Sequence, residues 1–133
     1  MKSDWDTARG WLRKAESDLA AAEICLRAGQ SLDTACFHCQ QAAEKSLKAW
    51  LIASLTSFRF IHDLTKLLAT CSLKEQGFNL FQADALQLNP FAVETRYDDE
   101  FWPTPQETQT ALDAARRIHA FVVSNFPEPP VQP

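Results

Sequence analysis

The chain has 133 residues, enough for one domain that buries a core without disulfides. With 46% hydrophobic residues and only 3 glycines its composition favours helix, and its formal net charge of −4 argues against a protein that coats a nucleic-acid backbone by bulk electrostatics, although a local basic patch is still allowed. No apolar run approaches the roughly twenty residues that cross a bilayer, and acidic residues occupy the N-terminal stretch where a secretory signal has its apolar core, so we expect a cytoplasmic protein that does not contact a membrane.

The first two predicted helices form a pair. Ser3, with Asp6 three residues later, predicts a capping box, and apolar residues then alternate by three and four until Gly29 provides a stop. Ser31 is the expected cap of a second helix that runs to about Ser54. Because the connection is short, the two helices should pack as an antiparallel hairpin.

A shorter third helix is predicted over residues 61–71, where apolar residues recur at helical spacing. Residues 77–97 are also consistent with helix, but Asn89 and Pro90 interrupt the pattern. From Pro90 to Pro103 the chain forms either a second short helix or an ordered loop.

The last predicted helix has the strongest start signal in the chain. Thr104 is a capping residue, Pro105 stands at the first helical position, and Glu107 completes a capping box. Its apolar positions continue to Pro127, after which residues 127–133 are a flexible proline-rich tail. The sequence therefore predicts an all-α fold, an up-and-down antiparallel bundle of four to five helices in one domain over residues 1–126.

Four cysteines raise the question of a metal site. Cys36 and Cys39 form a C-x-x-C pair, but Cys25 and Cys71 are isolated, so the second pair that a zinc site needs is missing. Cys36 and Cys39 also fall in the apolar sector of the second helix, where thiols behave as small hydrophobes. We predict core packing, with no metal and no cofactor.

The second helix carries a stripe of polar side chains that is open to two interpretations. At about 100° per residue, four of them share one sector, and the apolar residues Cys36, Cys39, Ala43, Leu47 and Trp50 lie opposite. The stripe is either a binding surface or an ordinary solvated face, in which Glu44 and Lys48 are an i,i+4 pair and Lys45 only keeps the surface soluble. Its four residues are His38, Gln41, Lys45 and Lys48.

Three segments occur in the order found in one protein family: FHCQQAAEKSLKAW, IHDLTKLL, and RYDDEFWP before the last helix. On these segments the chain resembles the HEPN domain, a small helical nucleotide-binding module of higher eukaryotes and prokaryotes, and the resemblance spans nearly the whole chain. It implies a dimerising helical bundle, often encoded beside a small nucleotidyltransferase as a two-component, toxin–antitoxin-like pair.

One branch of that family resembles a metal-independent ribonuclease whose signature is an arginine followed, after four to six intervening residues, by a histidine. This sequence departs from the signature. Arg59 meets His62 too soon, Arg96 is followed at those offsets by Phe, Trp and Pro, and Arg117 is next but one to His119. A second departure is Asp98, where relatives commonly have proline after the Arg-Tyr pair.

The resemblance leads to a non-catalytic subunit that binds a nucleotide or a partner protein, in which lysines would hold a phosphate, Arg96 would grip it and Tyr97 would stack on a base. The alternative is a metal-independent endoribonuclease that cleaves RNA. His62, Arg96 and His119 would together supply the base, the acid and the positive charge that this reaction needs. A third interpretation is a structural or partner-binding module anchored by an exposed tryptophan, Trp102. We expect a homodimer under all three. The predicted binding residues are His38, Gln41, Lys45, Lys48, His62, Asp63, Arg96 and Tyr97.

Overall fold

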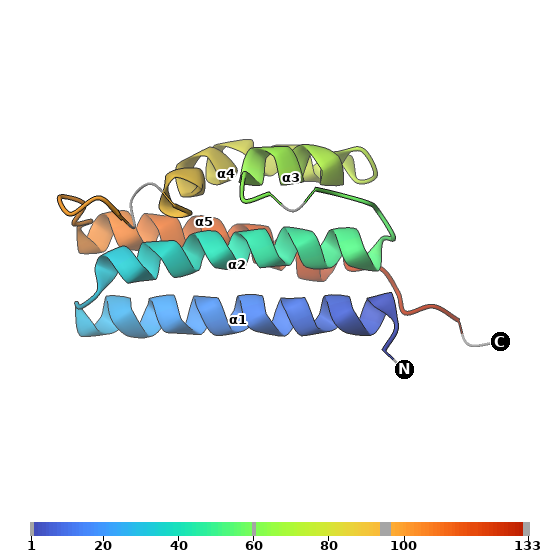
Figure 1. Cartoon of the computed structure of the whole chain (residues 1–133), viewed down its shortest axis with the longest axis horizontal. Coiled ribbons are helices and arrows are strands. Elements are labelled where there is room, and N and C mark those ends of the chain that lie inside the picture. The colour runs from blue at the N-terminus through green and yellow to red at the C-terminus, as the bar shows by residue number, and fades with distance from the viewer. Residues whose placement is uncertain (1, 60, 94–96, 132–133) are drawn as a thin grey trace.

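A computed structural model describes residues 2–59, 61–93 and 97–131, and all of its regular structure in these ranges is helical. Figure 1 shows the long helices side by side, with the shorter ones covering the side of α2 that faces away from α1. The helical-bundle prediction is confirmed. The α-helices are α1 (Asp4–Ala28), α2 (Leu32–Ala53), α3 (Leu64–Ser72), α4 (Gln82–Leu88) and α5 (Pro105–Ser124), and the 3₁₀ helices are η1 (Gln76–Phe81) and η2 (Asn89–Phe91).

The α1–α2 hairpin has the predicted limits, but one cap differs. Ser3 and Asp6 form the expected capping box, and Gly29 ends α1 with a left-handed φ of 66°, a conformation that glycine adopts without strain. Ser31 stands at the N-cap position of α2 but makes no side-chain capping bond. The reason is its backbone, because a φ of 56° is left-handed, whereas a capping serine has extended backbone that brings its oxygen to the first-turn N–H groups.

Helix α3 begins at Leu64, not at residue 61 as predicted. The side chain of Asp63 accepts hydrogen bonds from the backbone N–H groups of Thr65 at 3.0 Å and Lys66 at 3.4 Å. These bonds satisfy donors that have no partner inside the helix, so the helix starts after Asp63. Residues 61 and 62 are therefore non-helical, and His62 precedes the helix instead of beginning it.

The last helix ends at Ser124, before the predicted limit at Pro127. Asn125 terminates it, because its side chain donates to the carbonyl of Phe121 at 2.9 Å while its own carbonyl accepts from the Trp50 indole at 2.9 Å. Phe126, an apolar residue within the predicted limit, lies beyond the helix with its ring 6.3 Å from that of Trp5. The predicted start, with Thr104, Pro105 and Glu107, is confirmed.

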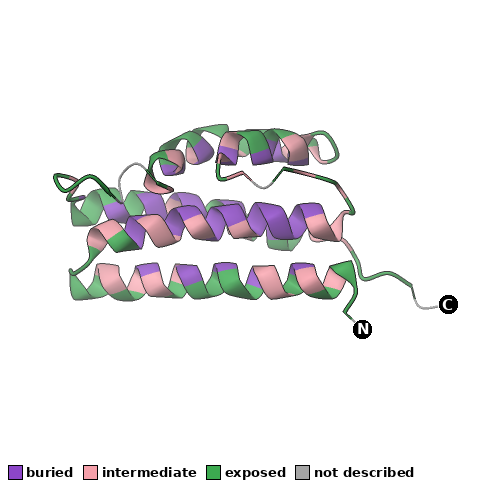
Figure 2. Cartoon of the chain, in the orientation of Figure 1, coloured by how far each residue is buried: buried purple, intermediate pink, exposed green. Residues whose placement is uncertain are grey.

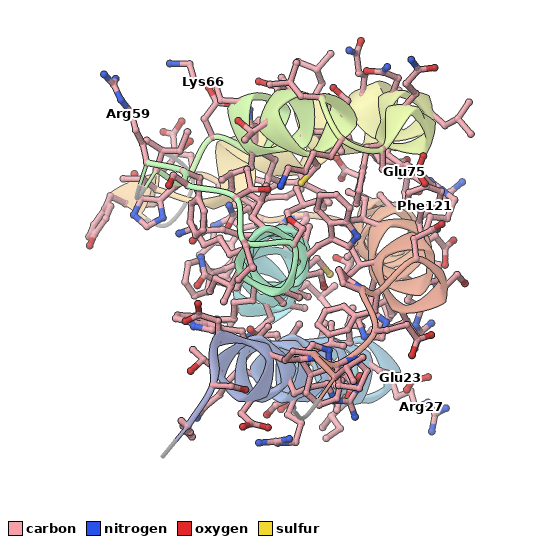
Figure 3. The ribbon with its side chains drawn as sticks, turned by 90° about the vertical axis from the view of Figure 1, so that its right-hand side faces the viewer. Glu23, Arg27, Arg59, Lys66, Glu75 and Phe121 are labelled. Atoms are coloured by element: carbon pink, nitrogen blue, oxygen red, sulfur yellow. The ribbon has the colours of Figure 1, made fainter. Side chains whose placement is uncertain are left out.

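Helix α2 forms the centre of the molecule, as its largely buried ribbon in Figure 2 and the end-on view in Figure 3 show. Cys36, Cys39 and Cys71 are fully buried, so the predicted core role of the C-x-x-C pair is confirmed. Burial raises the pKa of Cys39 and of Cys71 to about 12. In the described part of the chain, no helix combines the length and the apolar character that a membrane span requires.

Candidate functional site

Polar residues lie along the buried part of α2 at intervals of four. Gln40, Glu44 and Lys48 are each less than a tenth exposed, although they lie in the helix that supplies most of the core. A spacing of four places side chains above one another on one helical face. This face of α2 meets the segment that leads into α3, which is where His62 lies.

The carboxylate of Glu44 collects three donors. Its Oε2 lies 2.9 Å from Nζ of Lys48, its Oε1 accepts from Nε2 of Gln40 at 3.0 Å, and Nδ1 of His62 lies 3.0 Å from Oε1 and 3.2 Å from Oε2. The Gln40 amide also donates to the backbone carbonyl of His62 at 3.2 Å, and Gln41 donates to Gln40 at 2.8 Å. We call Gln40, Gln41, Glu44, Lys48 and His62 the Glu44 cluster.

The electrostatics of this cluster depend on its hydrogen bonds. Burial raises the pKa of Glu44, but hydrogen bonds from Gln40, Lys48 and His62, together with the charge of Lys48, outweigh burial and leave the pKa below its ordinary value. The side chains of Glu44 and Lys48 are only 5% and 8% exposed. Two opposite charges that are buried together must stay paired, since either alone would lose its hydration without compensation.

His62 is the most exposed member of the cluster, with 64% of its side chain accessible to solvent. A carboxylate only accepts hydrogen bonds, so Nδ1 carries a proton in its bond to Glu44. Among the described residues, Nε2 makes no hydrogen bond, and it is the ring atom left to a ligand or a reacting group. Carboxylates hold a histidine in one tautomer in the same way in many catalytic and binding sites.

A pocket of about 300 Å³ lies beside this ring and is lined by His62, Asp63, Asn89, Pro90, Ala92 and Val93. Two of its polar residues also hold α3 in place. Oδ1 of Asp63 accepts from the Thr65 hydroxyl at 2.6 Å and from the Asn89 amide at 2.9 Å, and these bonds lower the pKa of Asp63. Oδ1 of Asn89 accepts from the backbone N–H of Leu64 at 2.7 Å. The pocket wall is therefore fixed by the start of α3.

A second ion cluster, the Asp18 cluster, joins α1 to α2. One oxygen of Asp18 lies 2.8 Å from Nδ1 of His38 and the other 2.7 Å from Nζ of Lys45. The Asp18 side chain is 10% exposed, and those of His38 and Lys45 are 28% and 22% exposed. The structure thus differs from the single polar stripe that the sequence suggested, because His38 and Lys45 turn to α1 whereas Lys48 is buried in the Glu44 cluster.

The other predicted site residues lie elsewhere. Arg96 lies outside the described residues. The side chain of Tyr97 is exposed, and so is that of Trp102, as the sequence indicated. His119 is mostly buried in α5, with Nε2 3.1 Å from Glu16 of α1. The structure therefore brings His62 and Asp63 together at one pocket but holds His119 with a different carboxylate in a different place.

Three residues that organise these clusters were missed by sequence reasoning. Asp18 lies at an apolar position of α1, four residues before Ala22, which is the one signal that it is buried. Gln40 precedes Glu44 by four residues, the same spacing as the Glu44–Lys48 pair, and this spacing was the available signal. Asn89 was interpreted only as a helix interruption, and its bond to α3 spans 25 residues, so no local pattern contains it.

Comparison with known proteins identifies a family and solved structures that this chain resembles. The family model described as HEPN domain matches residues 8–126. The structure is similar to the crystal structure of TT1696 from Thermus thermophilus, with 33% identity, a TM-score of 0.76, and coverage of 88% of this chain and 96% of that one. It is also similar to ST0689, described as an archaeal HEPN homologue, with 25% identity, a TM-score of 0.73, and coverage of 95% and 99%. A search of curated proteins found no match. On the extent of the family match, the chain belongs to the HEPN domain family.

Proposed function

We propose that this chain is a non-catalytic HEPN subunit that binds a nucleotide or a partner protein and works with a small nucleotidyltransferase in a two-component, toxin–antitoxin-like system. The observation that carries the proposal is the pairing of its histidines. His38, His62 and His119 are the 3 histidines of the chain, and they are held by Asp18, Glu44 and Glu16 respectively.

This pairing bears on catalysis because RNA cleavage without a metal needs a base, an acid and a cation at one phosphate. Three histidines on three separate carboxylates do not provide such a group. The sequence also lacks the arginine-to-histidine spacing of the ribonuclease branch. Binding of a ligand does not need these three groups at one place. A single exposed and oriented imidazole ring can contribute a hydrogen bond to it.

The pocket beside His62 is the binding site in this proposal. Its volume of about 300 Å³ is at the lower end of small-molecule sites, and it suits one base or one inserted side chain. His62 would contribute a hydrogen bond through Nε2, and Asp63 would contribute its carboxylate at the same wall. The exposed ring of Tyr97 would add a stacking surface.

The proposal includes a homodimer that acts in the cytoplasm. The exposed Trp102, with 73% of its surface accessible, has the large amphipathic ring that anchors many protein interfaces. Sedimentation over a range of concentrations tests the dimer directly, and a chain that stays monomeric throughout contradicts it.

The test of function is a tagged pull-down from the native cell at low salt, followed by mass spectrometry of proteins and of small bound nucleotides. We expect a nucleotidyltransferase in stoichiometric amount, with recovery reduced in His62→Ala and unchanged in Lys66→Ala. Lys66 is a suitable control because it is an exposed cation only four residues away. Recovery that is equal in both variants refutes the assignment of the site.

One observation favours a second candidate, the RNA-cleaving toxin. A histidine oriented by a buried carboxylate and exposed on its other side is the arrangement of a general base. Expression of this chain alone would then arrest growth and fragment RNA, and His62→Ala would abolish both effects. Absence of fragmentation in the parent chain eliminates this candidate.

A further inference from the structure

A hollow of about 650 Å³ runs along α1, away from the His62 pocket. The lining residues from α1 share one face of that helix, because they recur at intervals of three and four residues. They include Thr7, Gly10, Lys14 and Ser17. The lining also includes Lys45 of α2, so the hollow lies beside the contact between α1 and α2. We call this hollow the α1 groove, and it is lined by Lys2, Thr7, Gly10, Trp11, Arg13, Lys14, Ser17 and Lys45.

The α1 groove is lined by positively charged side chains, although the chain as a whole is acidic. These side chains are Lys2, Arg13, Lys14 and Lys45, and the net charge of the chain is −4. Lys45 is balanced by Asp18. In the described ranges the side chains of Lys2, Arg13 and Lys14 make no ion pair.

Two acidic side chains that lie beside lysines of the groove, Asp6 and Asp18, do not cancel its charge. Asp6 lies close enough to Lys2 for the charge of Lys2 to help lower its pKa, after the larger effect of hydrogen bonds from Ser3. Asp18 already serves two cations, His38 when protonated and Lys45. The positive charge of Arg13 and Lys14 therefore remains available to a ligand.

Gly10 provides an independent observation. Glycine in the interior of a helix destabilises it relative to alanine, and it is usually kept where a neighbour approaches closely. Here nothing in the protein does so, because a Cβ at Gly10 would meet only the end of the Arg13 side chain, at 3.8 Å. Packing gives no reason for this glycine, whereas a ligand that approaches the backbone of α1 does.

We propose that the α1 groove binds single-stranded nucleic acid, with phosphates on Arg13 and Lys14 and a base against Trp11. Trp11 is half-buried and packs against the core, so it offers a fixed aromatic surface beside the cations. Cations beside a fixed aromatic ring are the standard chemistry of single-strand binding. This inference stands apart from the proposed function, because it concerns another face and another set of residues.

The length of the groove selects a strand over a free nucleotide. Thr7 and Ser17 are about 15 Å apart along the axis of α1, a distance that a single phosphate does not bridge. A chain of several nucleotides places successive phosphates along such a distance. An acidic peptide would also satisfy the charges, but it would make no use of the tryptophan face or of the backbone opened at Gly10.

The test is fluorescence anisotropy with the whole chain and a labelled single-stranded RNA of roughly ten nucleotides. We expect Arg13→Ala/Lys14→Ala to weaken binding about tenfold or more. The slope of log affinity against log salt should become less steep by about 1.4, since each contact to a single-strand phosphate contributes about 0.7. Gly10→Glu fills the groove with a good helix former of the opposite charge, and we expect it to weaken binding without lowering the melting temperature.

The matched control is Arg59→Ala/Lys66→Ala, which also removes two exposed cations. Figure 3 shows Arg59 and Lys66 on the α3 side of the molecule, far from α1, and we expect affinity to change by less than about twofold. The inference is overturned by loss of binding in the control with none in the groove variants, by competition from AMP as effective as that from the RNA, or by binding of a polyglutamate peptide in place of RNA. A parent chain that binds no RNA overturns it as well.

Discussion

Removal of the Glu44 carboxylate is the most informative test of how the fold supports its candidate site. In Glu44→Ala, the amide of Gln40, the ammonium of Lys48 and the imidazole of His62 all lose the acceptor that they share. The loss is uneven. The Lys48 side chain is 8% exposed, so water replaces the carboxylate poorly there, whereas that of His62 is 64% exposed and is readily hydrated.

The expected magnitude follows from the buried pair. Truncation of one partner of a buried ion pair costs about 3–5 kcal/mol, a large part of the roughly 5–15 kcal/mol that stabilises a domain. For a chain of 133 residues, this cost corresponds to a melting temperature lower by about 10–18 °C. His62→Ala, by contrast, removes only an exposed partner and should cost under about 1 kcal/mol.

Thermal and urea unfolding followed by circular dichroism measure both variants. The double variant Glu44→Leu/Lys48→Met separates the cost of breaking the buried charge pair from the cost of a lost contact, because it removes both charges and keeps the volume. We expect it to recover most of the loss, since apolar replacements of a buried pair are often neutral or better. A cost below about 1 kcal/mol for Glu44→Ala, or no recovery in the double variant, refutes the reasoning.

Four further outcomes are expected. The pKa of Glu44 in the folded chain lies below its ordinary value of 4.5, so the contribution of its ionised form to stability is present above that pH. This contribution is lost as the pH falls through the lowered pKa. Unfolding free energies measured against pH should show the loss in the parent chain and not in Glu44→Gln. Asp18→Ala leaves two donors without their acceptor and should cost about 1–3 kcal/mol in urea. Gly10→Ala should stabilise by about 0.5–1 kcal/mol, because the new methyl group meets only ordinary contact. Gly77→Ala should destabilise by about 1–3 kcal/mol in the same assay, because its Cβ would lie 2.5 Å from the ring of Phe121, and equal effects of the two glycine substitutions would refute this comparison.

The fold was largely predictable because its signals are local. Capping boxes at Ser3 and Thr104 and the stop at Gly29 each depend on residues within a few positions, and the structure has all three. The two errors in helix limits have one cause in common. The start of α3 is set by the side-chain cap at Asp63 and the end of α5 by hydrogen bonds at Asn125, and hydrophobic periodicity contains neither.

The candidate site was less predictable for the same reason. Periodicity gives the direction in which a side chain leaves its helix, but it does not say which neighbour that side chain meets. His38 and Lys48 share a sector of α2, yet His38 pairs with Asp18 of α1 whereas Lys48 is buried and pairs with Glu44 of its own helix. The acceptors that separate them, Asp18 and Glu44, looked like ordinary members of charged helices.

The distribution of paired charge finally indicates where a polyanion can bind. The cations that the sequence pattern selected, Lys45 and Lys48, are neutralised inside the chain by Asp18 and Glu44. A phosphate would have to displace these carboxylates, at the cost of stranding them where hydration is poor. Within the described residues, Arg13 and Lys14 on α1 form no ion pair, so a ligand can bind them without breaking an internal bond. Nucleic-acid binding and the fold are thus separable on α1, whereas in the Glu44 cluster a change made to test binding would also change stability.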